Sequence, residues 1–168
     1  MKIVVLGDTH MPKKGARFPS RLIQEMENCD LIVHTGDIQE LAFLQELEHF
    51  APVKAVVGNT DGEKERARLP EREIFTAGGL TFGLVHGHGE RLTTEKRAVA
   101  AFSDMETAPD CILFGHSHLP LLRYVNKTLL FNPGSVTDKR KLPYYSFGLL
   151  YVEKQEIRAE HIFYQDKS

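Results

Sequence analysis

The chain has 168 residues, of which 42% are hydrophobic and 26% charged, and its formal net charge is −2. This length suits one domain over 1–168 with a substantial hydrophobic core, and the composition is ordinary for a soluble globular protein. The weak negative charge provides no general attraction to a nucleic-acid backbone or to an anionic membrane.

Two cysteines, Cys29 and Cys111, are too few for a disulfide framework, and both lie beside apolar runs. We therefore expect them to be reduced core residues of a cytosolic protein. The first ten residues, "MKIVVLGDTH", contain an apolar run that is too short for a signal peptide or a membrane span. A cytoplasmic location without a membrane partner is the resulting expectation.

The first third of the sequence alternates between strand-forming and helix-forming segments. This alternation indicates βαβ units and a parallel sheet that is buried on both faces. No repeat or Gly/Ser-rich linker marks a domain boundary. Strands are predicted over 3–7, 31–36 and 53–58, and helices over 20–29, with Ser20 as N-cap, and over 39–50.

After residue 72 the pattern changes to paired strands. The segment 62–73 has mixed charge and predicts an exposed loop or short helix. A βαβ opening followed by hairpins indicates an α/β fold, a four-layer α/β/β/α sandwich of two mixed sheets flanked by helices. The remaining predicted elements are hairpins over 73–87, 121–135 and 144–164, turning near Gly78-Gly79, Asn126-Lys127 and 153–155, a helix over 94–105 and a strand over 110–115.

Polar side chains follow five of the predicted strands. Each group alone has the composition of an ordinary turn. Because the carboxyl ends of parallel strands meet at one edge of a sheet, we expect these residues to converge although they span more than a hundred positions. The groups are Asp8-Thr9-His10, Asp37, Asn59-Thr60-Asp61, His86-Gly87-His88 and His116-Ser117-His118.

A cluster of carboxylates and histidines without a cation would be costly, because like charges repel and burial desolvates them. A metal site removes that cost. Oxygen and imidazole ligands without thiolate suit Mn²⁺, Fe²⁺, Ni²⁺, Zn²⁺ or Mg²⁺. Seven or more candidate ligands exceed the needs of one ion, so the sequence favours two ions with a shared carboxylate.

These motifs, in this order, resemble the signature of the calcineurin-like metallophosphoesterase superfamily. The chain length, "HGHG" at 86–89 and "NPGS" at 132–135 resemble its small bacterial and archaeal phosphodiesterase branch. That branch is also similar to the metallophosphoesterase-fold subunit of retromer. The resemblance extends from the first strand to about residue 135.

The resemblance implies a phosphodiesterase in which a hydroxide between two divalent ions, Mn²⁺ before the other metals, attacks the phosphorus of a small phosphodiester. Asp37 would bridge the ions, and Asp61 would orient its neighbours. Asn59 would also lie near the substrate phosphate, and His88 would contact the substrate or support a ligand. One ion would be held by Asp8, His10 and His118, and the other by Asn59, His86 and His116.

One position departs from the superfamily pattern. Many members have a histidine where this chain has Thr60, and that histidine can protonate the leaving oxygen. Threonine cannot do so near neutral pH. We therefore expect a preference for good leaving groups, or a proton supplied by water or by another histidine.

Several alternatives stay open at this stage. The protein could be a binding scaffold like the retromer subunit, or a nuclease, although its charge does not favour a nucleic-acid polymer as partner. A homo-oligomer is also open. Lys13, Lys14 and Arg17 are either a solvated basic loop or contacts for a phosphate, and Asn132 or Ser135 could contact substrate. His34, His49 and His161 are expected to be structural or exposed.

Overall fold

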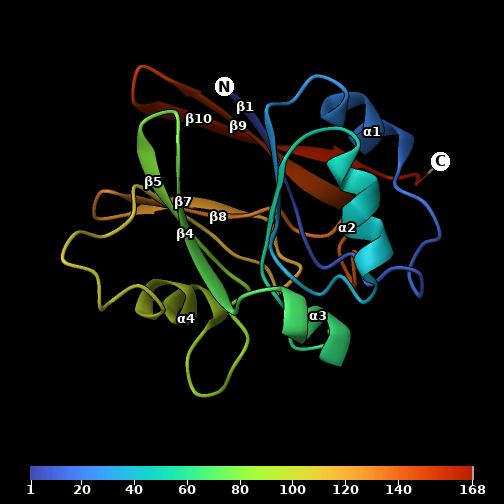
Figure 1. The fold of residues 1–168 in the computed structure, drawn as a ribbon, viewed down its shortest axis with the longest axis horizontal. Coiled ribbons are helices and arrows are strands. Elements are labelled where there is room, and N and C mark those ends of the chain that lie inside the picture. Colours follow the sequence, from blue (N-terminus) through green and yellow to red (C-terminus); the bar gives the residue numbers. More distant parts are fainter. Residues whose placement is uncertain (168) are drawn as a thin grey trace.

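The computed structural model describes residues 1–167, which form two five-stranded mixed sheets and four short helices (Figure 1). The strands are β1 (Lys2–Leu6), β2 (Leu31–His34), β3 (Val53–Ala55), β4 (Arg72–Ala77), β5 (Leu80–Val85), β6 (Cys111–Leu113), β7 (Leu121–Val125), β8 (Thr128–Asn132), β9 (Tyr145–Glu153) and β10 (Glu156–Tyr164). The helices are α1 (Ser20–Met26), α2 (Leu41–Glu48), α3 (Glu63–Arg68) and α4 (Thr94–Ala100).

The first sheet has the strand order β10-β9-β1-β2-β3. Strands β1, β2 and β3 are parallel, as the alternating pattern predicts, with Ile3 opposite Leu31 and Ile32 opposite Val53. The long hairpin β9–β10 joins this sheet through an antiparallel pairing of β9 with β1. The carboxyl ends of β1, β2 and β3 therefore meet at one edge of the sheet.

The second sheet has the order β4-β5-β6-β8-β7. Its centre is parallel, because β6 runs parallel to both β5 and β8. The hairpins β4–β5 and β7–β8 turn at Gly78-Gly79 and at Asn126-Lys127, which confirms both predicted turns. This sheet thus contributes the exits of β5 and β6 to the site.

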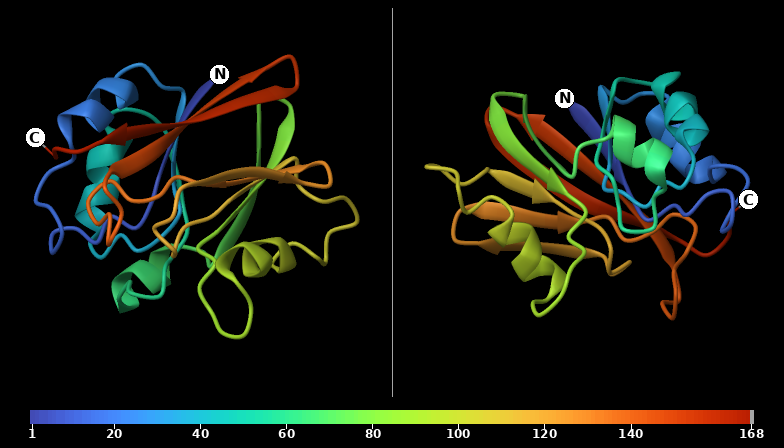
Figure 2. Two further views of the ribbon diagram at one scale, coloured as in Figure 1. Left: turned by 180° about the vertical axis from the view of Figure 1, so that it is seen from behind. Right: turned by 60° about the horizontal axis from the view of Figure 1, so that its bottom comes forward.

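The two sheets pack face to face, and helices cover their outer faces. Strand β1 shows how the sequence produces these layers. Ile3 and Val5 belong to the core between the sheets, whereas Val4 and Leu6 pack on the other face with Leu22 of α1. Helix α4 covers the outer face of the second sheet through Ala98 and its neighbours. Figures 1 and 2 show α1 and α2 on one side of the paired sheets and α4 on the other, which confirms the predicted α/β/β/α order.

The predicted helices are correct in position but too long. Helix α1 begins at Ser20 and its N-cap is Pro19, so the prediction of Ser20 as N-cap was wrong. The apolar periodicity continues past the last helical turn in α1, α2 and α4, and periodicity alone does not locate a helix end. Within the described part of the chain, no helix has the length and apolar character needed to cross a membrane.

Candidate metal centre

The predicted metal ligands lie in the loops that follow the strands, and many have an uncommon backbone conformation. Non-glycine residues seldom adopt positive φ, and those that do cluster at functional sites. Five of the seven predicted ligands have positive φ: Asp8, His10, Asp37, His116 and His118. Most of the predicted ligands thus lie in sharp turns with a backbone conformation that is uncommon for non-glycine residues.

The first ligand group combines Asp8, His10 and His118, whose ligand atoms all lie within 4.8 Å of one another. The Nε2 atoms of the two histidines are 3.2 Å apart. His118 Nε2 also lies 3.6 Å from Asp8 Oδ1. Its Nδ1 is 2.6 Å from the carbonyl oxygen of Asp138, which can only accept, so Nδ1 carries the hydrogen and Nε2 the lone pair.

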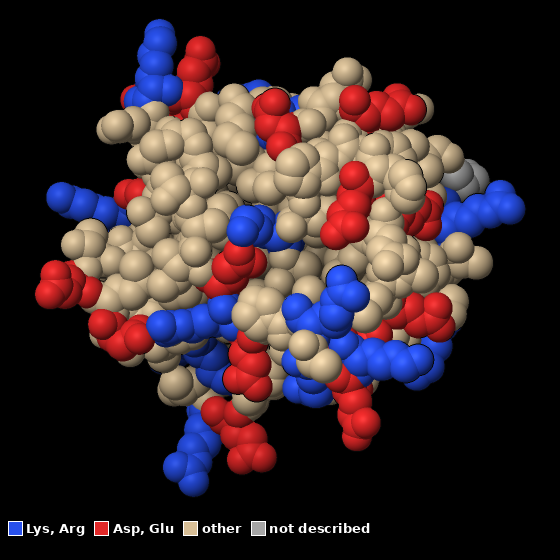
Figure 3. Space-filling view, viewed as in Figure 1, with Lys and Arg blue, Asp and Glu red and all other residues tan. Residues whose placement is uncertain are grey.

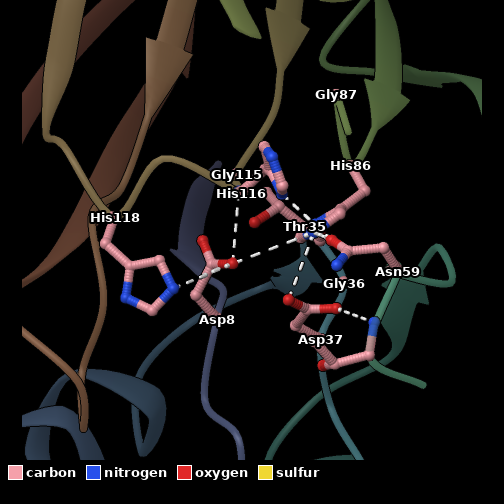
Figure 4. A network of polar contacts seen from close by, with 12 residues as sticks. Asp8, Thr35, Gly36, Asp37, Asn59, His86, Gly87, Gly115, His116 and His118 are labelled. Carbon is pink, nitrogen blue, oxygen red and sulfur yellow. Dashed lines mark hydrogen bonds and ion pairs between the residues drawn. The ribbon is translucent and has the colours of Figure 1, made fainter. Parts of the chain in front are cut away.

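The second ligand group combines Asp8, Asp37 and His86. The Nδ1–H of His86 donates to the carbonyl oxygen of Thr35 at 2.8 Å, so its Nε2 carries the lone pair of the neutral ring. That nitrogen lies 3.4 Å from Asp37 Oδ2 and 4.0 Å from Asp8 Oδ1 (Figure 4). A lone pair facing carboxylate oxygens is repulsive unless a proton or a cation lies between them.

Asn59 connects this group to His116. The Oδ1 atom of Asn59 lies 3.1 Å from His86 Nε2 and 3.0 Å from His116 Nδ1. These three side chains therefore point to one region, as the predicted ligand set of the second ion requires. Asn59 is exposed whereas His86 is fully buried, so the set extends from the core to the surface.

Asp37 lies between the two predicted ligand sets. Its Oδ1 accepts the backbone N–H of Thr60 at 2.9 Å. Its Oδ2 lies 3.4 Å from His86 Nε2 and 3.6 Å from His10 Nε2. Asp8 also belongs to both groups, so either carboxylate has the position of a bridge. The bridging role of Asp37 stays a prediction.

Asp61 holds the ligand loops through backbone hydrogen bonds. Its Oδ1 accepts the N–H groups of Ile38 and Gln39, both at 2.7 Å. Its Oδ2 accepts those of Asp37 at 3.1 Å and Gly58 at 2.7 Å. The buried carboxylate therefore ties the loop after β2 to the loop after β3, an arrangement that suits a residue orienting its neighbours.

Gly58 is required for space at this junction. A Cβ atom at this position would lie 2.1 Å from Asp37 Oδ1 and 2.3 Å from the Asp37 backbone nitrogen. No side chain fits there without moving Asp37. A glycine is therefore needed at this strand exit because two ligand loops approach each other closely there.

The predicted ligands differ in the direction in which their surroundings shift the pKa. Burial raises the pKa of Asp8 to about 7, opposed by His86 and reinforced by Asp37. Burial also acts to lower the pKa of His86, but the hydrogen bond to Asp37 and the charge of Asp8 prevail and raise it. Burial lowers the pKa values of His116 and His118 to about 4. These two imidazoles are therefore neutral at physiological pH and offer lone pairs.

The donor set fits divalent cations. Among the described residues, the buried Asp8 Oδ2 has no hydrogen-bond partner. A buried carboxylate with an unpartnered oxygen is costly, and a cation bound at Asp8 would neutralise its charge. The two overlapping groups offer carboxylate oxygen and imidazole nitrogen without sulfur, the donor types that Mn²⁺, Fe²⁺, Ni²⁺ and Zn²⁺ accept.

The other predicted site residues lie at or beneath this centre. His88 is exposed, with its ring centroid 5.4 Å from that of His86, so it lies at the mouth of the centre. Thr60 is also exposed, and its Oγ1 is 3.4 Å from His10 Nδ1. Asn132 and Ser135 are buried, which does not support a substrate contact. Asn132 instead donates to the Gly115 carbonyl, and Ser135 to that of Asp8.

Three residues that support the centre carried no motif. His34, expected to be structural or exposed, is buried and joins two ligand loops, because it accepts the N–H of Gly36 at 3.1 Å and contacts Thr9 Oγ1 at 3.2 Å. Asp138 orients His118 through its carbonyl oxygen, and Arg140 lies beside the same ring. Asp138 and Arg140 come after the last recognisable motif, so only the fold brings them to the site.

With this fold and this histidine–aspartate centre, the chain has the features of a metallophosphoesterase. Residues 1–155 match the model of the calcineurin-like phosphoesterase superfamily domain, and the chain belongs to this superfamily. A probable metallophosphoesterase of Methanothermobacter thermautotrophicus is 35% identical over 166 residues, which cover 96% of this chain and 92% of that protein. A phosphodiesterase of Methanocaldococcus jannaschii is 27% identical over 171 residues, covering 94% and 97%.

Solved structures show the same fold. The crystal structure of wild-type Vps29 complexed with Zn²⁺ from Entamoeba histolytica matches with a TM-score of 0.74 at 23% identity, covering 97% of this chain and 99% of that one. Vps29 is the retromer subunit to which the sequence motifs are similar. At this identity the likeness extends to the fold alone, and a shared fold does not establish a shared function.

Proposed function

We propose that this protein is a metal-dependent phosphodiesterase that hydrolyses a small phosphodiester at a centre of two divalent ions. The convergence of seven oxygen and nitrogen ligand residues from five strand exits carries this proposal. The activity in the name of the Methanocaldococcus relative supports the diester class. When bound, the ions would acidify a water molecule and neutralise charge on the phosphoryl oxygens.

The chain itself would fix the ligand geometry before substrate arrives. His86 is oriented by the Thr35 carbonyl and His118 by that of Asp138, so both rings present Nε2 to the centre. Asp61 holds the backbone on either side of Asp37. Such supporting contacts tune metal sites, and their loss typically costs about 10- to 100-fold in affinity or activity.

Two exposed residues would contact the substrate. Asn59 directs Oδ1 toward His86 and His116, which leaves its Nδ2 to donate to a phosphoryl oxygen. His88 lies at the mouth, and burial lowers its pKa, so it is neutral near pH 7. A neutral imidazole is a poor proton donor, so a proton for the leaving oxygen would come from solvent, and substrates with good leaving groups need none.

The metal identity and the partners are part of the proposal. Mn²⁺ is our first choice, and Zn²⁺ is the main alternative, because the Entamoeba Vps29 of the same fold was crystallised as a complex with Zn²⁺. The expected partner is a small phosphodiester in the cytoplasm. On the face shown in Figure 3, acidic side chains stand among basic ones, which does not favour a long nucleic acid there.

A non-catalytic scaffold is the competing proposal, because Vps29 has the same fold. One assay separates the two functions. The protein is freed of metal, refilled with Mn²⁺, Zn²⁺, Ni²⁺ or Mg²⁺, and given bis(p-nitrophenyl) phosphate. We expect hydrolysis with at least one metal and a loss of more than about a hundredfold in Asp37→Ala and Asn59→Ala. The exposed His49, remote from the motifs, provides the His49→Ala control.

Each alternative has its own outcome in this assay. An inactive wild-type protein with every metal would support the scaffold. Degradation of single-stranded oligonucleotides at rates comparable to those of the small diester would support a nuclease. Equal activity of Asp37→Ala and the wild type would place the chemistry elsewhere on the molecule.

A further inference from the structure

Two neighbouring loops beside the Asp8–His10–His118 group are rich in basic residues. Loops 11–17 and 137–143 together contain six lysines and arginines and a single acidic residue, Asp138. An ion pair between Lys14 Nζ and Asp138 Oδ2 at 3.6 Å joins the loops. Thr137 also donates a hydrogen bond to the carbonyl oxygen of Thr9. The second loop is therefore attached to the segment that carries Asp8 and His10.

Arg140 extends from this pair of loops to the edge of the metal centre. Its Nη2 lies 3.1 Å from His118 Nε2, and its Nε lies 3.1 Å from Asp138 Oδ2. A single imidazole lone pair serves one partner, and the proposed function assigns that of His118 to a metal ion. A guanidinium at this position is therefore placed to bind an oxygen next to the centre.

The local charges are not balanced. Lys14 and Arg140, which we name the basic rim, share the one carboxylate of Asp138 and leave an excess positive charge. In the proposed centre, two divalent ions would exceed the carboxylates of Asp8 and Asp37 by two charges. One diester anion and one hydroxide would neutralise that excess. The charge of the basic rim then has no counterpart in a singly charged substrate.

We propose that the basic rim binds a second phosphate group of the substrate, so that the substrate class is a phosphodiester bearing a terminal phosphate on the His118 side. This inference rests on the proposed function. The planar guanidinium of Arg140 matches two phosphate oxygens, and Lys14 adds a point charge next to it. Asn59 and His116 lie at the other end of the centre. Binding of the second phosphate at the basic rim would therefore fix the direction in which the substrate lies across the centre.

The test compares two chromogenic diesters that differ by one phosphate: thymidine 5′-(p-nitrophenyl phosphate) and its 3′-phosphorylated form. With the wild-type protein we expect the 3′-phosphate to lower KM by about tenfold or more. In Arg140→Gln, the loss of kcat/KM should be at least about fivefold greater for the phosphorylated substrate than for the plain one. The advantage should also shrink with added salt, because the rim is exposed.

Arg123→Gln is the matched control. The Arg123 side chain is 58% exposed and pairs with Glu95 at 3.3 Å, whereas that of Arg140 is 59% exposed and pairs with Asp138 at 3.1 Å. Arg123 lies on β7, in the second sheet. This variant should retain the full preference for the phosphorylated substrate. Equal losses for both substrates in Arg140→Gln, or no preference in the wild type, would overturn the proposal.

Binding measurements separate this inference from the proposed function. Calorimetry with the Mn²⁺-loaded protein compares thymidine 3′,5′-bisphosphate with thymidine 5′-phosphate and needs no turnover. We expect tighter binding of the bisphosphate and loss of that difference in Arg140→Gln. An inactive protein that still shows this difference would refute the proposed phosphodiesterase activity but support phosphate binding at the basic rim. An active protein that binds both ligands equally would refute only the claim that the basic rim binds a second phosphate.

Discussion

The Nε2 atoms of His10 and His118 lie 3.2 Å apart, although 108 positions separate the two residues in the sequence. The rings are nearly parallel, with an interplanar angle of 17°. Because His118 Nδ1 carries the ring hydrogen, its Nε2 directs a lone pair at its partner. The fold holds these nitrogens beside Asp8, whose Oδ1 lies 3.6 Å from His118 Nε2, an arrangement that a shared cation would stabilise.

The first prediction concerns stability on metal binding. Addition of Mn²⁺ to chelator-treated protein should raise the melting temperature, since an ion that binds only the native state stabilises it by about 2.7 kcal/mol at a hundred times its Kd. In His118→Ala most of this gain should disappear, because one ligand of the Asp8 group is lost. The gain in His49→Ala, an exposed histidine that bonds to the Gln45 carbonyl, should match the wild type. Differential scanning calorimetry measures all three proteins, and an unchanged gain in His118→Ala would contradict the predicted ligand set.

The second prediction concerns the pH dependence of metal binding. The pKa of Asp8 is raised to about 7 by burial, so below that pH a proton competes with the ion. The pKa values of His116 and His118 are lowered to about 4, so these rings are already deprotonated above about pH 5. Affinity for Mn²⁺ should therefore rise by about tenfold or more per pH unit from about 5 to 7 and level off at higher pH.

Calorimetry at several pH values and in buffers of different ionisation enthalpy measures both the slope and the released proton. The pKa of His86 is also raised, so a proton on its ring competes with the metal ion as the proton on Asp8 does. In Asp8→Asn one titrating group is removed, so the slope should become shallower while His86 still contributes. An affinity that fell with rising pH would show that the protonation states assigned to the centre are wrong.

The third prediction concerns Asp61, whose two oxygens accept four backbone N–H groups. In Asp61→Asn the side-chain amide offers one oxygen instead of two, so buried N–H groups lose their acceptors. This should lower the free energy of unfolding by about 1–3 kcal/mol and reduce metal affinity, because Asp37 is no longer held. Asp104→Asn, at an exposed ion pair with Arg72, should change stability by less than about 1 kcal/mol. Urea denaturation measures the free energy of unfolding of the two variants. Equal losses in both would show that Asp61 does not stabilise the ligand loops more than an exposed ion pair stabilises the surface.

The strands, and the convergence of the polar residues that follow them, could be predicted from sequence because both depend on local patterns. The alternation of Ile3, Val4, Val5 and Leu6 places successive side chains on opposite faces of β1, and the structure assigns them to two different cores. Polar residues directly after such strands must then lie at the edge of the sheet. Two glycines at 78–79 were likewise enough to locate the turn of a hairpin.

The helix ends and the supporting residues depend on contacts between distant segments. Nothing near Arg140 in the sequence indicates that it reaches His118, because Ser135 bonding to the Asp8 carbonyl brings this loop to the centre. His34 lies within a strand pattern, and its role requires Thr9 and Gly36 to approach it. Sequence analysis thus recovers residues that a motif carries, whereas residues that act through the fold require the structure.

The last prediction concerns Thr60, which occupies the position where many members of the superfamily have a histidine. Thr60 is exposed at the mouth of the centre, and its backbone N–H donates to Asp37 Oδ1 at 2.9 Å. A histidine side chain can therefore be introduced without removing that hydrogen bond. Thr60→His should accelerate hydrolysis of diesters with poor leaving groups by about tenfold or more, because a positioned general acid contributes 10²–10⁴-fold in favourable cases.

The measurement compares p-nitrophenyl and methyl esters of the same phosphate as a function of pH. The gain should be confined to the methyl ester and should disappear as the new imidazole loses its proton at high pH. In Thr60→Gln, which has a similar size and no titrating group, the poor substrate should stay slow. A Thr60→His protein that leaves the methyl ester unchanged would show that the leaving oxygen already receives its proton from another source, and the exposed imidazole of His88 would then be the next residue to test.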